Sequence, residues 1–325
     1  MMTTITDVLK KGIDAHSHGD LQAAVSSYQA ALAMDEANAT AHNNLGFVYA
    51  QLAQWQLAKM HLEKAIQLDK KLAVAYANLG QVQAATGNGE EGIKNLQKSV
   101  QLEPKNIDHW NNLARIYFAA NEFENAEYAW HRALSLHPDS AEFTVKLATT
   151  MVSQKRFDEA HGLFDAAINL DPFYAQAWAQ KGVLLLLEQN YGDCKKCLQQ
   201  ALNIAPSEYT ALKHMALAHL ACGETGKAIG VMRLLYQSFP GDHLVGSDLA
   251  VMELSIGEKE IARDRLCQLS ETNRDSRILY YYAVSLKETH GDINLIKSLL
   301  EEVLHREDEY SEKAGQILQT IGISE

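Results

Sequence analysis

One six-residue segment, GNGEEG at residues 87–92, has the glycine spacing G-x-G-x-x-G of sites that bind dinucleotides. Such a site needs a strand before the glycines and a helix N-terminus facing the pyrophosphate, whereas this segment follows a pattern typical of a helix. It also places Glu90 and Glu91 where the negative phosphates would lie. The segment therefore does not predict a nucleotide site, and its glycines need another explanation.

Two further pairs of residues could bind a metal ion or carry redox chemistry. Cys194 and Cys197 form a C-x-x-C pair, but no second pair follows at the spacing of a zinc site. His16 and His18 flank a turn without a cluster of carboxylates nearby. We expect no catalytic residue, no metal site and no cofactor, and packing is the favoured role of the two cysteines.

Side-chain amides could do a different chemistry, the recognition of a peptide backbone. The segment AHNNLGFVYA, residues 41–50, carries Asn43 and Asn44 inside an apolar helical pattern, although Asn is a mediocre helix former. An amide donates and accepts hydrogen bonds at once, as the N–H and C=O groups of a peptide require. The amide of Asn44 recurs at equal intervals along the chain, at Asn78 and Asn112. A repeated element must therefore position these side chains.

The prolines of the chain recur at the same interval as these amides. They are Pro104, Pro138, Pro172, Pro206 and Pro240. With proline at position 32 of each unit, the units begin near residues 5, 39, 73, 107, 141, 175, 209, 243 and 277. Positions 8 and 20 then hold small residues, which two closely packed helices need where their backbones approach.

Position 15 of the unit carries the signal of a turn between two helices. It is often Gly or Asn, the residues that tolerate the left-handed backbone ending a helix. These residues are Gly19, Gly87, Gly223, Gly257, Gly291 and Asn121. Each unit is therefore predicted to be a helix, a turn and a second helix.

The pattern of these repeat positions resembles the tetratricopeptide repeat family, whose repeat is about 34 residues long and so has the period of this chain. The family's sequence of aromatic, Leu-Gly, Tyr, Ala, aromatic, Ala and Pro is met by Trp110, Leu45, Gly46, Tyr49, Ala58, Trp130, Ala65 and Pro138. The resemblance implies an all-α fold, a right-handed superhelix (α-solenoid) of about nine repeats, as a single domain over residues 1–325. A capping helix is expected at about 310–323. The last two units depart from the pattern, since Gly246 replaces the aromatic residue and Arg274 the proline.

In this family, positions 2, 5, 6, 9, 12 and 13 of each unit line a concave groove. The resemblance makes this groove the predicted peptide-binding site. Its polar candidates are Asn43, Asn44, Asn78, Gln81, Asn111, Asn112, Arg115, Lys146 and Gln180, and its apolar candidates are Val183, Leu187, Leu217 and Val251. The amide column is similar to that of O-linked N-acetylglucosamine transferase, where groove asparagines hold extended polypeptides. The alternatives are that the amides are merely solvated and that each apolar residue packs between helices.

Composition and charge narrow the partners. The chain has 325 residues, 47% of them hydrophobic, and a formal net charge of −12, which disfavours binding to nucleic acid or anionic lipid and leaves basic peptides open. No apolar run approaches the roughly 20 residues that cross a bilayer, so no membrane insertion is expected. No secretory signal is recognisable, and four cysteines fit a reducing compartment. The expected location is therefore the cytoplasm.

The function predicted from these features is a non-catalytic protein-interaction scaffold or adaptor that binds an extended polypeptide in its groove. The amides of the groove are expected to be solvated in the free protein. Two alternatives stay open: a structural scaffold that self-associates into homo-oligomers, and a targeting subunit that presents substrates to a separate enzyme such as a transferase. The family's carboxylate-binding pattern is disfavoured, because Lys213 is followed by Leu217 and Asp248 at the next required positions.

Overall fold

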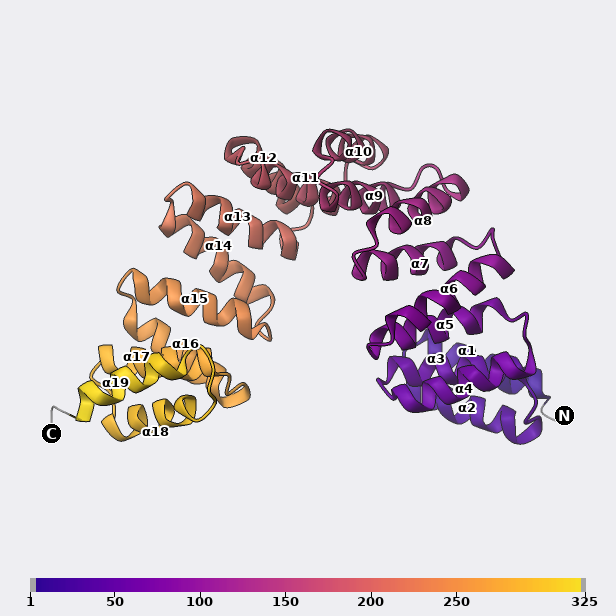
Figure 1. The fold of residues 1–325 in the computed structure, drawn as a ribbon, viewed down its shortest axis with the longest axis horizontal. Coiled ribbons are helices and arrows are strands. Elements are labelled where there is room, and N and C mark those ends of the chain that lie inside the picture. Colours follow the sequence, from indigo (N-terminus) through magenta and orange to yellow (C-terminus); the bar gives the residue numbers. More distant parts are fainter. Residues whose placement is uncertain (1–3, 323–325) are drawn as a thin grey trace. The chain divides into compact units, whose positions relative to one another are not determined.

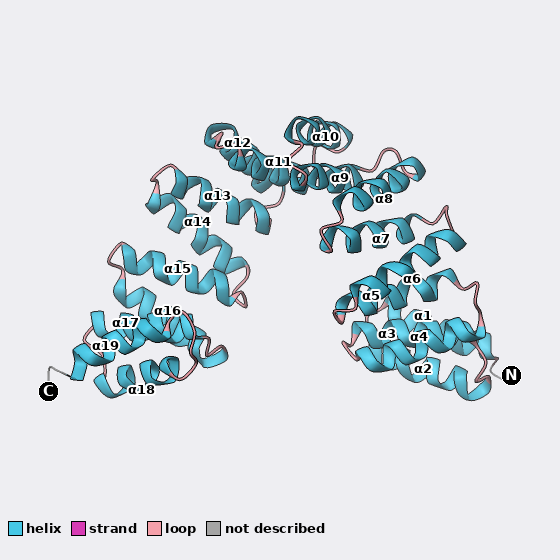
Figure 2. Cartoon of the chain, in the orientation of Figure 1, coloured by secondary structure: helices cyan, strands magenta, loops and turns pink. Residues whose placement is uncertain are grey.

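The computed structural model describes residues 4–322, which form helices and short connections with no strand among them (Figures 1 and 2). The chain divides into two compact units, Met1–Pro172 and Phe173–Glu325. The helices of the first unit are α1 (Ile5–Ser17), α2 (Leu21–Met34), α3 (Ala39–Gln51), α4 (Trp55–Leu68), α5 (Ala73–Ala85), α6 (Gly89–Leu102), α7 (Ile107–Ala119), α8 (Phe123–Leu136), α9 (Ala141–Ser153) and α10 (Phe157–Leu170). Those of the second unit are α11 (Ala175–Leu187), α12 (Tyr191–Ile204), α13 (Tyr209–Ala221), α14 (Thr225–Ser238), α15 (His243–Ser255), α16 (Lys259–Thr272), α17 (Ser276–Glu288), α18 (Ile293–Leu304) and α19 (Ser311–Gly322).

The helices confirm the predicted repeat and the all-α solenoid fold. The first helix of each repeat begins at the predicted residue, except that α17 begins at Ser276, one residue before the expected start at 277. The helix at the predicted capping position is α19, Ser311–Gly322, slightly shorter than the predicted 310–323, and residue 323 lies outside the described residues. That residues 1–325 form one continuous domain stays a prediction.

Side chains at the helix ends explain why the helices begin and end at these residues. The Asn38 side chain accepts a hydrogen bond from the backbone N–H of Ala41 at 2.9 Å, and Ser140 caps α9 in the same way through Phe143 N–H at 3.2 Å. Such caps satisfy backbone donors that have no partner inside the helix. At the other end, Pro138 lies two residues after α8 ends, where the ring prevents the helix from continuing.

The turn between the two helices of a repeat has left-handed backbone whichever residue occupies it. The glycines predicted for this turn have positive φ at Gly19, Gly87, Gly223 and Gly257, and so does Asn121. Ala53, Lys155 and Gln189 adopt the same conformation, with φ between 55° and 61°. The turn geometry is therefore imposed by the packing of the helix pair and not by glycine alone.

The ninth repeat corrects the prediction for Gly291. The residue with positive φ there is His290, with φ of 54°, and Gly291 is not left-handed. The reason is that α17 begins and ends one residue early, at Ser276 and Glu288. The left-handed position after the helix moves back by one residue with it.

Small residues bring paired helices into backbone contact. A Cβ atom placed on Gly80 of α5 would lie 2.7 Å from the carbonyl oxygen of Gly92 of α6, and the reverse substitution would be equally close. The space beside these contacts is filled by large side chains at position 24, such as Leu96 and Phe164, which are fully buried. Interlocking of small and large residues thus sets the close approach of each helix pair.

The last helix of the second unit covers the apolar side of α18. Ala314 and Ile321 of α19 are buried in one cluster with Leu299, Leu300 and Val303 of α18. A solenoid needs such a cover because each repeat buries its apolar face only against its neighbour.

Candidate functional site

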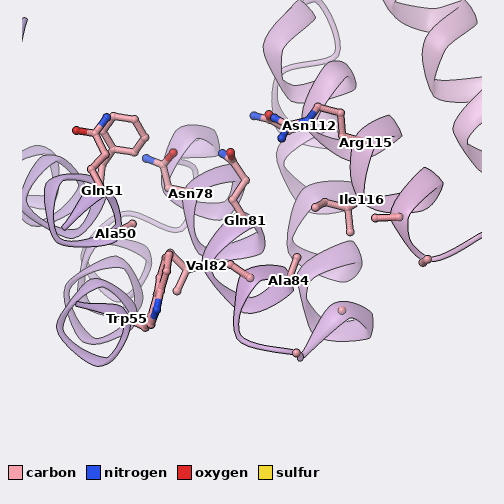
Figure 3. A pocket seen from close by; sticks show the side chains of 16 residues that line it. Ala50, Gln51, Trp55, Asn78, Gln81, Val82, Ala84, Asn112, Arg115 and Ile116 are labelled. Atoms are coloured by element: carbon pink, nitrogen blue, oxygen red, sulfur yellow. The ribbon is translucent and has the colours of Figure 1, made fainter. Parts of the chain in front are cut away.

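A cavity of about 620 Å³ lies in the first unit and is lined by residues of α3, α5 and α7 together with Trp55 at the start of α4. Figure 3 shows the side chains of Gln51, Asn78 and Gln81 on one side and those of Trp55 and Val82 on the other. The volume falls in the range typical of ligand pockets, which are mostly apolar with a few polar groups.

Small residues at the ends of three successive first helices make the room for this cavity. Ala50 near the end of α3, Ala84 and Ala85 at the end of α5, and Ala119 and Ala120 at the end of α7 all line it. In the fifth repeat, the first helix is α9, and the corresponding residues are Val152, Ser153 and Gln154 instead of alanines. The cavity is therefore confined to the second, third and fourth repeats.

Four of the predicted polar residues share one wall of the cavity. Asn78 and Gln81 lie on α5, and Asn112 and Arg115 lie at the same positions of the next repeat, on α7. Residues three apart on a helix face the same side, so each helix contributes one amide and one longer polar side chain. Figure 3 shows Asn112 and Arg115 next to one another on α7.

Two of these side chains are available to a ligand. Arg115 is exposed and has no ion-pair partner among residues 4–322, and no carboxylate lines the cavity. The amide of Asn112 is partly exposed and makes no hydrogen bond within the described part of the chain. The wall therefore offers an amide and a positive charge that the protein does not itself satisfy.

The other amides form a network inside the protein, which corrects the expectation that they are solvated. Asn78 and Asn43 are only 8% and 5% exposed. Asn78 Nδ2 donates to Asn43 Oδ1 at 3.0 Å, and Asn43 Nδ2 donates to Asn44 Oδ1 at 3.1 Å. Burial raises the pKa of Tyr28, and a hydrogen bond with Asn44 partly offsets this rise. These bonds connect α5 to α3 and α3 to α2. They supply the partners that buried polar groups need.

The remaining polar candidates do not reach the cavity. Lys146 of α9 donates to Asn111 Oδ1 at 3.0 Å, forms a short contact with Glu142, and lies 5.2 Å from the centre of the Trp130 ring. Both Asn111 and Lys146 are therefore engaged within the protein. Gln180 is part of α11 in the second unit and does not line this cavity.

The apolar candidates all belong to the second unit. Leu187 of α11 and Leu217 of α13 are 57% and 43% exposed, whereas Val183 and Val251 are partly buried. The two leucines are thus not fully buried between helices, as the packing alternative would require. The two leucines lie on α11 and α13, which contact one another, and an apolar groove at these residues stays a prediction.

Several residues of the cavity are not among the predicted site residues. They are Phe47, Gln51, Trp55, Val82 and Ile116, with the small residues at and after the helix ends. The signal that could have revealed them is the run of Ala and Gly at positions 12–15 in the third repeat, AATG at residues 84–87. Two of the glycines of the segment GNGEEG, Gly87 and Gly89, line the same cavity.

Sequence models of a known family match much of the chain. A model described as TPR repeat matches residues 15–52, and models described as tetratricopeptide repeat match residues 39–72 and residues 77–141, 111–175 and 145–193. The chain belongs to the tetratricopeptide repeat (TPR) family. This confirms the predicted family, whereas the further resemblance to the groove of O-linked N-acetylglucosamine transferase stays a prediction.

Solved structures similar to this TPR protein share little of its sequence. A structure described as a functional characterisation of PilF of Pseudomonas aeruginosa has a TM-score of 0.51 and 20% identity, and covers 64% of this chain and 94% of that chain. YrrB, described as a TPR protein with an unusual peptide-binding site, has a TM-score of 0.47 and 22% identity, over 57% of this chain and 95% of that chain. MamA has a TM-score of 0.47 and 24% identity, over 54% of this chain and 96% of that chain. The likeness to PilF shows the fold alone. Among curated proteins, none matches the sequence.

The cysteine pair of this TPR protein has a packing environment. Cys194 is fully buried and Cys197 nearly so, and both belong to an apolar cluster of the second unit. Burial, reinforced by Cys197 and Cys222 nearby, raises the pKa of the Cys194 thiol to about 11. Since the thiolate is the reactive and metal-binding form, this environment does not favour either chemistry.

A pair of histidines joins α3 to α4 in the second TPR repeat. His42 Nδ1 and His61 Nδ1 are 2.9 Å apart, and His42 Nε2 is 3.1 Å from the carbonyl oxygen of Glu36. Burial, and to a smaller extent His42, lower the pKa of His61 to about 4. The His61 ring is therefore neutral at pH 7, and its protonation is unfavourable in the folded protein.

The described residues contain neither a metal-binding cluster nor a membrane-spanning helix. No group of three or more His, Cys, Asp or Glu side chains within residues 4–322 has the arrangement that a metal ion would need. No helix in this range is both long and apolar enough to cross a bilayer.

Proposed function

We propose that this TPR protein is a non-catalytic interaction scaffold that binds an extended polypeptide segment along the first helices of its first unit. The observation that carries the proposal is the cavity of about 620 Å³ with the unpaired Asn112 and Arg115 in its wall. TPR proteins generally mediate protein–protein interactions, and the family membership of this chain agrees with that role.

The spacing of the helices suits an extended chain. Neighbouring packed helices lie about 8–10 Å apart, and an extended peptide advances about 3.3 Å per residue, so one repeat corresponds to about three ligand residues. Asn78 on α5 and Asn112 on α7 occupy the same position of successive repeats. Each can contribute an amide to the ligand backbone, Asn78 through the oxygen and the second hydrogen that its bond to Asn43 leaves free.

A substitution that fills the cavity tests the proposal. Ala85 is exposed at the last position of α5 and lines the cavity. Ala221 is exposed at the last position of α13, which is the same repeat position in the second unit, and it does not line the cavity. Ala85→Phe should block the ligand, and Ala221→Phe is the matched control for the effect of an added ring on folding.

The experiment selects ligands from a display library of random 12-residue peptides and measures synthetic versions by fluorescence polarisation. We expect wild type and Ala221→Phe to bind the selected peptides equally, and Ala85→Phe to bind at least about tenfold more weakly, a loss of 1.4 kcal/mol. Circular dichroism checks that all three proteins are folded. A library that yields no binder, or binders that Ala85→Phe retains, would show that this cavity is not a polypeptide site.

A further inference from the structure

The cavity of the first unit combines an apolar floor with a single charged group. Phe47, Trp55 and Ile116 supply apolar surface, and Arg115 is the one ionisable side chain among the described lining residues. Trp55 is 37% exposed, so part of its indole ring is accessible to a ligand. Exposed apolar surface that is gathered in a hollow marks an interaction site more often than scattered apolar residues do.

We infer that the ligand segment carries a bulky apolar side chain and, within about two residues of it, a carboxylate that pairs with Arg115. This inference rests on the proposed function and specifies its ligand. The apolar side chain occupies the space left by the alanines at the helix ends, against Trp55. The carboxylate lies at the wall formed by Asn112 and Arg115, where the guanidinium donates and the amide adds a further donor.

The size of the cavity sets the separation of the two groups. A sphere of 620 Å³ is about 11 Å across, which equals about three residues of extended chain. Arg115 and Trp55 line the same cavity. A carboxylate more than a few residues away along an extended segment would therefore lie beyond the reach of Arg115.

The charges around the site decide between an acidic and a basic ligand group. The chain as a whole has a formal net charge of −12, which by itself favours basic partners. At physiological salt, however, exposed charges more than about 8 Å away are largely screened. The residues that line the cavity include Arg115 and no carboxylate. A lysine or arginine of the ligand placed here would face the like charge of Arg115.

Lys146, a predicted groove cation of the neighbouring repeat, is not available for the same task. Lys146 on α9 is already paired with Glu142 and Asn111. Arg115 is therefore the residue that distinguishes a carboxylate from an amide in the ligand. Loss of its charge should change selectivity as well as affinity.

The test uses the full-length protein and the display selection described above. The carboxylate of the best selected peptide is replaced by its amide, Asp to Asn or Glu to Gln, and both peptides are measured against wild type and Arg115→Gln. Lys105→Gln is the control, because Lys105 is an exposed lysine of the same unit that does not line the cavity. It removes the same charge elsewhere.

We expect selected peptides to share an apolar residue with Asp or Glu within two positions. Wild type and Lys105→Gln should bind the acidic peptide about three- to tenfold more tightly than its amide, and Arg115→Gln should bind both equally. Selected peptides without an acidic residue, whose binding Ala85→Phe still abolishes, would overturn this inference and leave the polypeptide site standing. A selection that yields no peptide, together with binding of a small aromatic acid such as 4-phenylbutyrate, would overturn both.

Discussion

Replacing Asn78 with Ala should destabilise the first unit, although Ala is the better helix former. Asn78 is 8% exposed, and its Nδ2 lies 3.0 Å from Asn43 Oδ1. The substitution leaves the buried oxygen of Asn43 without this donor, which costs about 1–3 kcal/mol. The gain in helix propensity returns about 0.5 kcal/mol. The expected net loss in the free energy of unfolding is therefore about 0.5–2.5 kcal/mol.

Asn112→Ala is the matched control, since Asn112 occupies the same repeat position without a hydrogen bond in the described residues. This substitution should leave the free energy of unfolding unchanged or raise it by about 0.5 kcal/mol. Unfolding by urea is followed by tryptophan fluorescence in a Trp178→Phe background. The remaining tryptophans, Trp55, Trp110 and Trp130, all belong to the first unit, so the signal reports on that unit.

A double-mutant cycle isolates the hydrogen bond between the two amides. Asn43→Ala and Asn78→Ala should each destabilise the protein, and the double variant should cost less than their sum by about 1 kcal/mol. The reasoning is refuted if the cycle gives no coupling, or if Asn78→Ala and Asn112→Ala shift the urea midpoint equally. Either result would mean that the buried amide pair contributes no more than two solvated amides.

Three further predictions concern other parts of the molecule. The folded-state pKa of His61, about 4, lies below its ordinary value of 6.5, so the unfolded chain binds more protons between these values. The free energy of unfolding should fall as the pH drops from 6.5 to 4, by about 1–2 kcal/mol for this partly exposed ring, and urea titrations at several pH values should show a smaller slope for His61→Gln. Gly80→Ala should lower the free energy of unfolding by more than about 2 kcal/mol, because the added Cβ meets the Gly92 backbone. Gly230→Ala, on the open surface of α14, should raise it by about 0.5–1 kcal/mol. Equal shifts of the melting temperature in calorimetry would contradict this packing. Deletion of residues 310–325 should expose Leu300 and Val303 and cause aggregation in light scattering, and a monomeric product with unchanged melting would show that α19 is not a cover.

The period of the sequence predicts the fold closely, because each repeat obeys the same local rules. Proline, glycine and small residues at fixed positions determine where each helix begins, ends and touches its partner. Where the structure differs from this prediction, the cause is local geometry that varies from one repeat to the next. His290 takes the left-handed conformation instead of Gly291 because α17 is displaced by one residue, and nothing in the proline or glycine spacing records that displacement.

The candidate site is less predictable than the fold. The register of the repeat places Asn78, Gln81, Asn112 and Arg115 on the groove face, and the structure brings these four together. The same register also places Asn43 on the groove face, yet Asn43 is buried where α3 packs against α5, and there it accepts a hydrogen bond from Asn78. Which amides form hydrogen bonds with one another depends on side-chain geometry between repeats, and the position of a residue within its repeat does not predict that geometry.

The restriction of the cavity to three repeats has a consequence for how a ligand is aligned. The first unit contains five helix pairs with the same backbone plan, and a uniform groove would let a chain slide from one pair to the next. Five equivalent alignments would be degenerate, and choosing one of them corresponds to about 1 kcal/mol at room temperature. If the proposed ligand binds here, the alanines at the ends of α3, α5 and α7 would remove that degeneracy, because its bulky side chain would fit the cavity and not the other repeats of this unit. The cavity would then fix which residue of the bound segment meets which repeat.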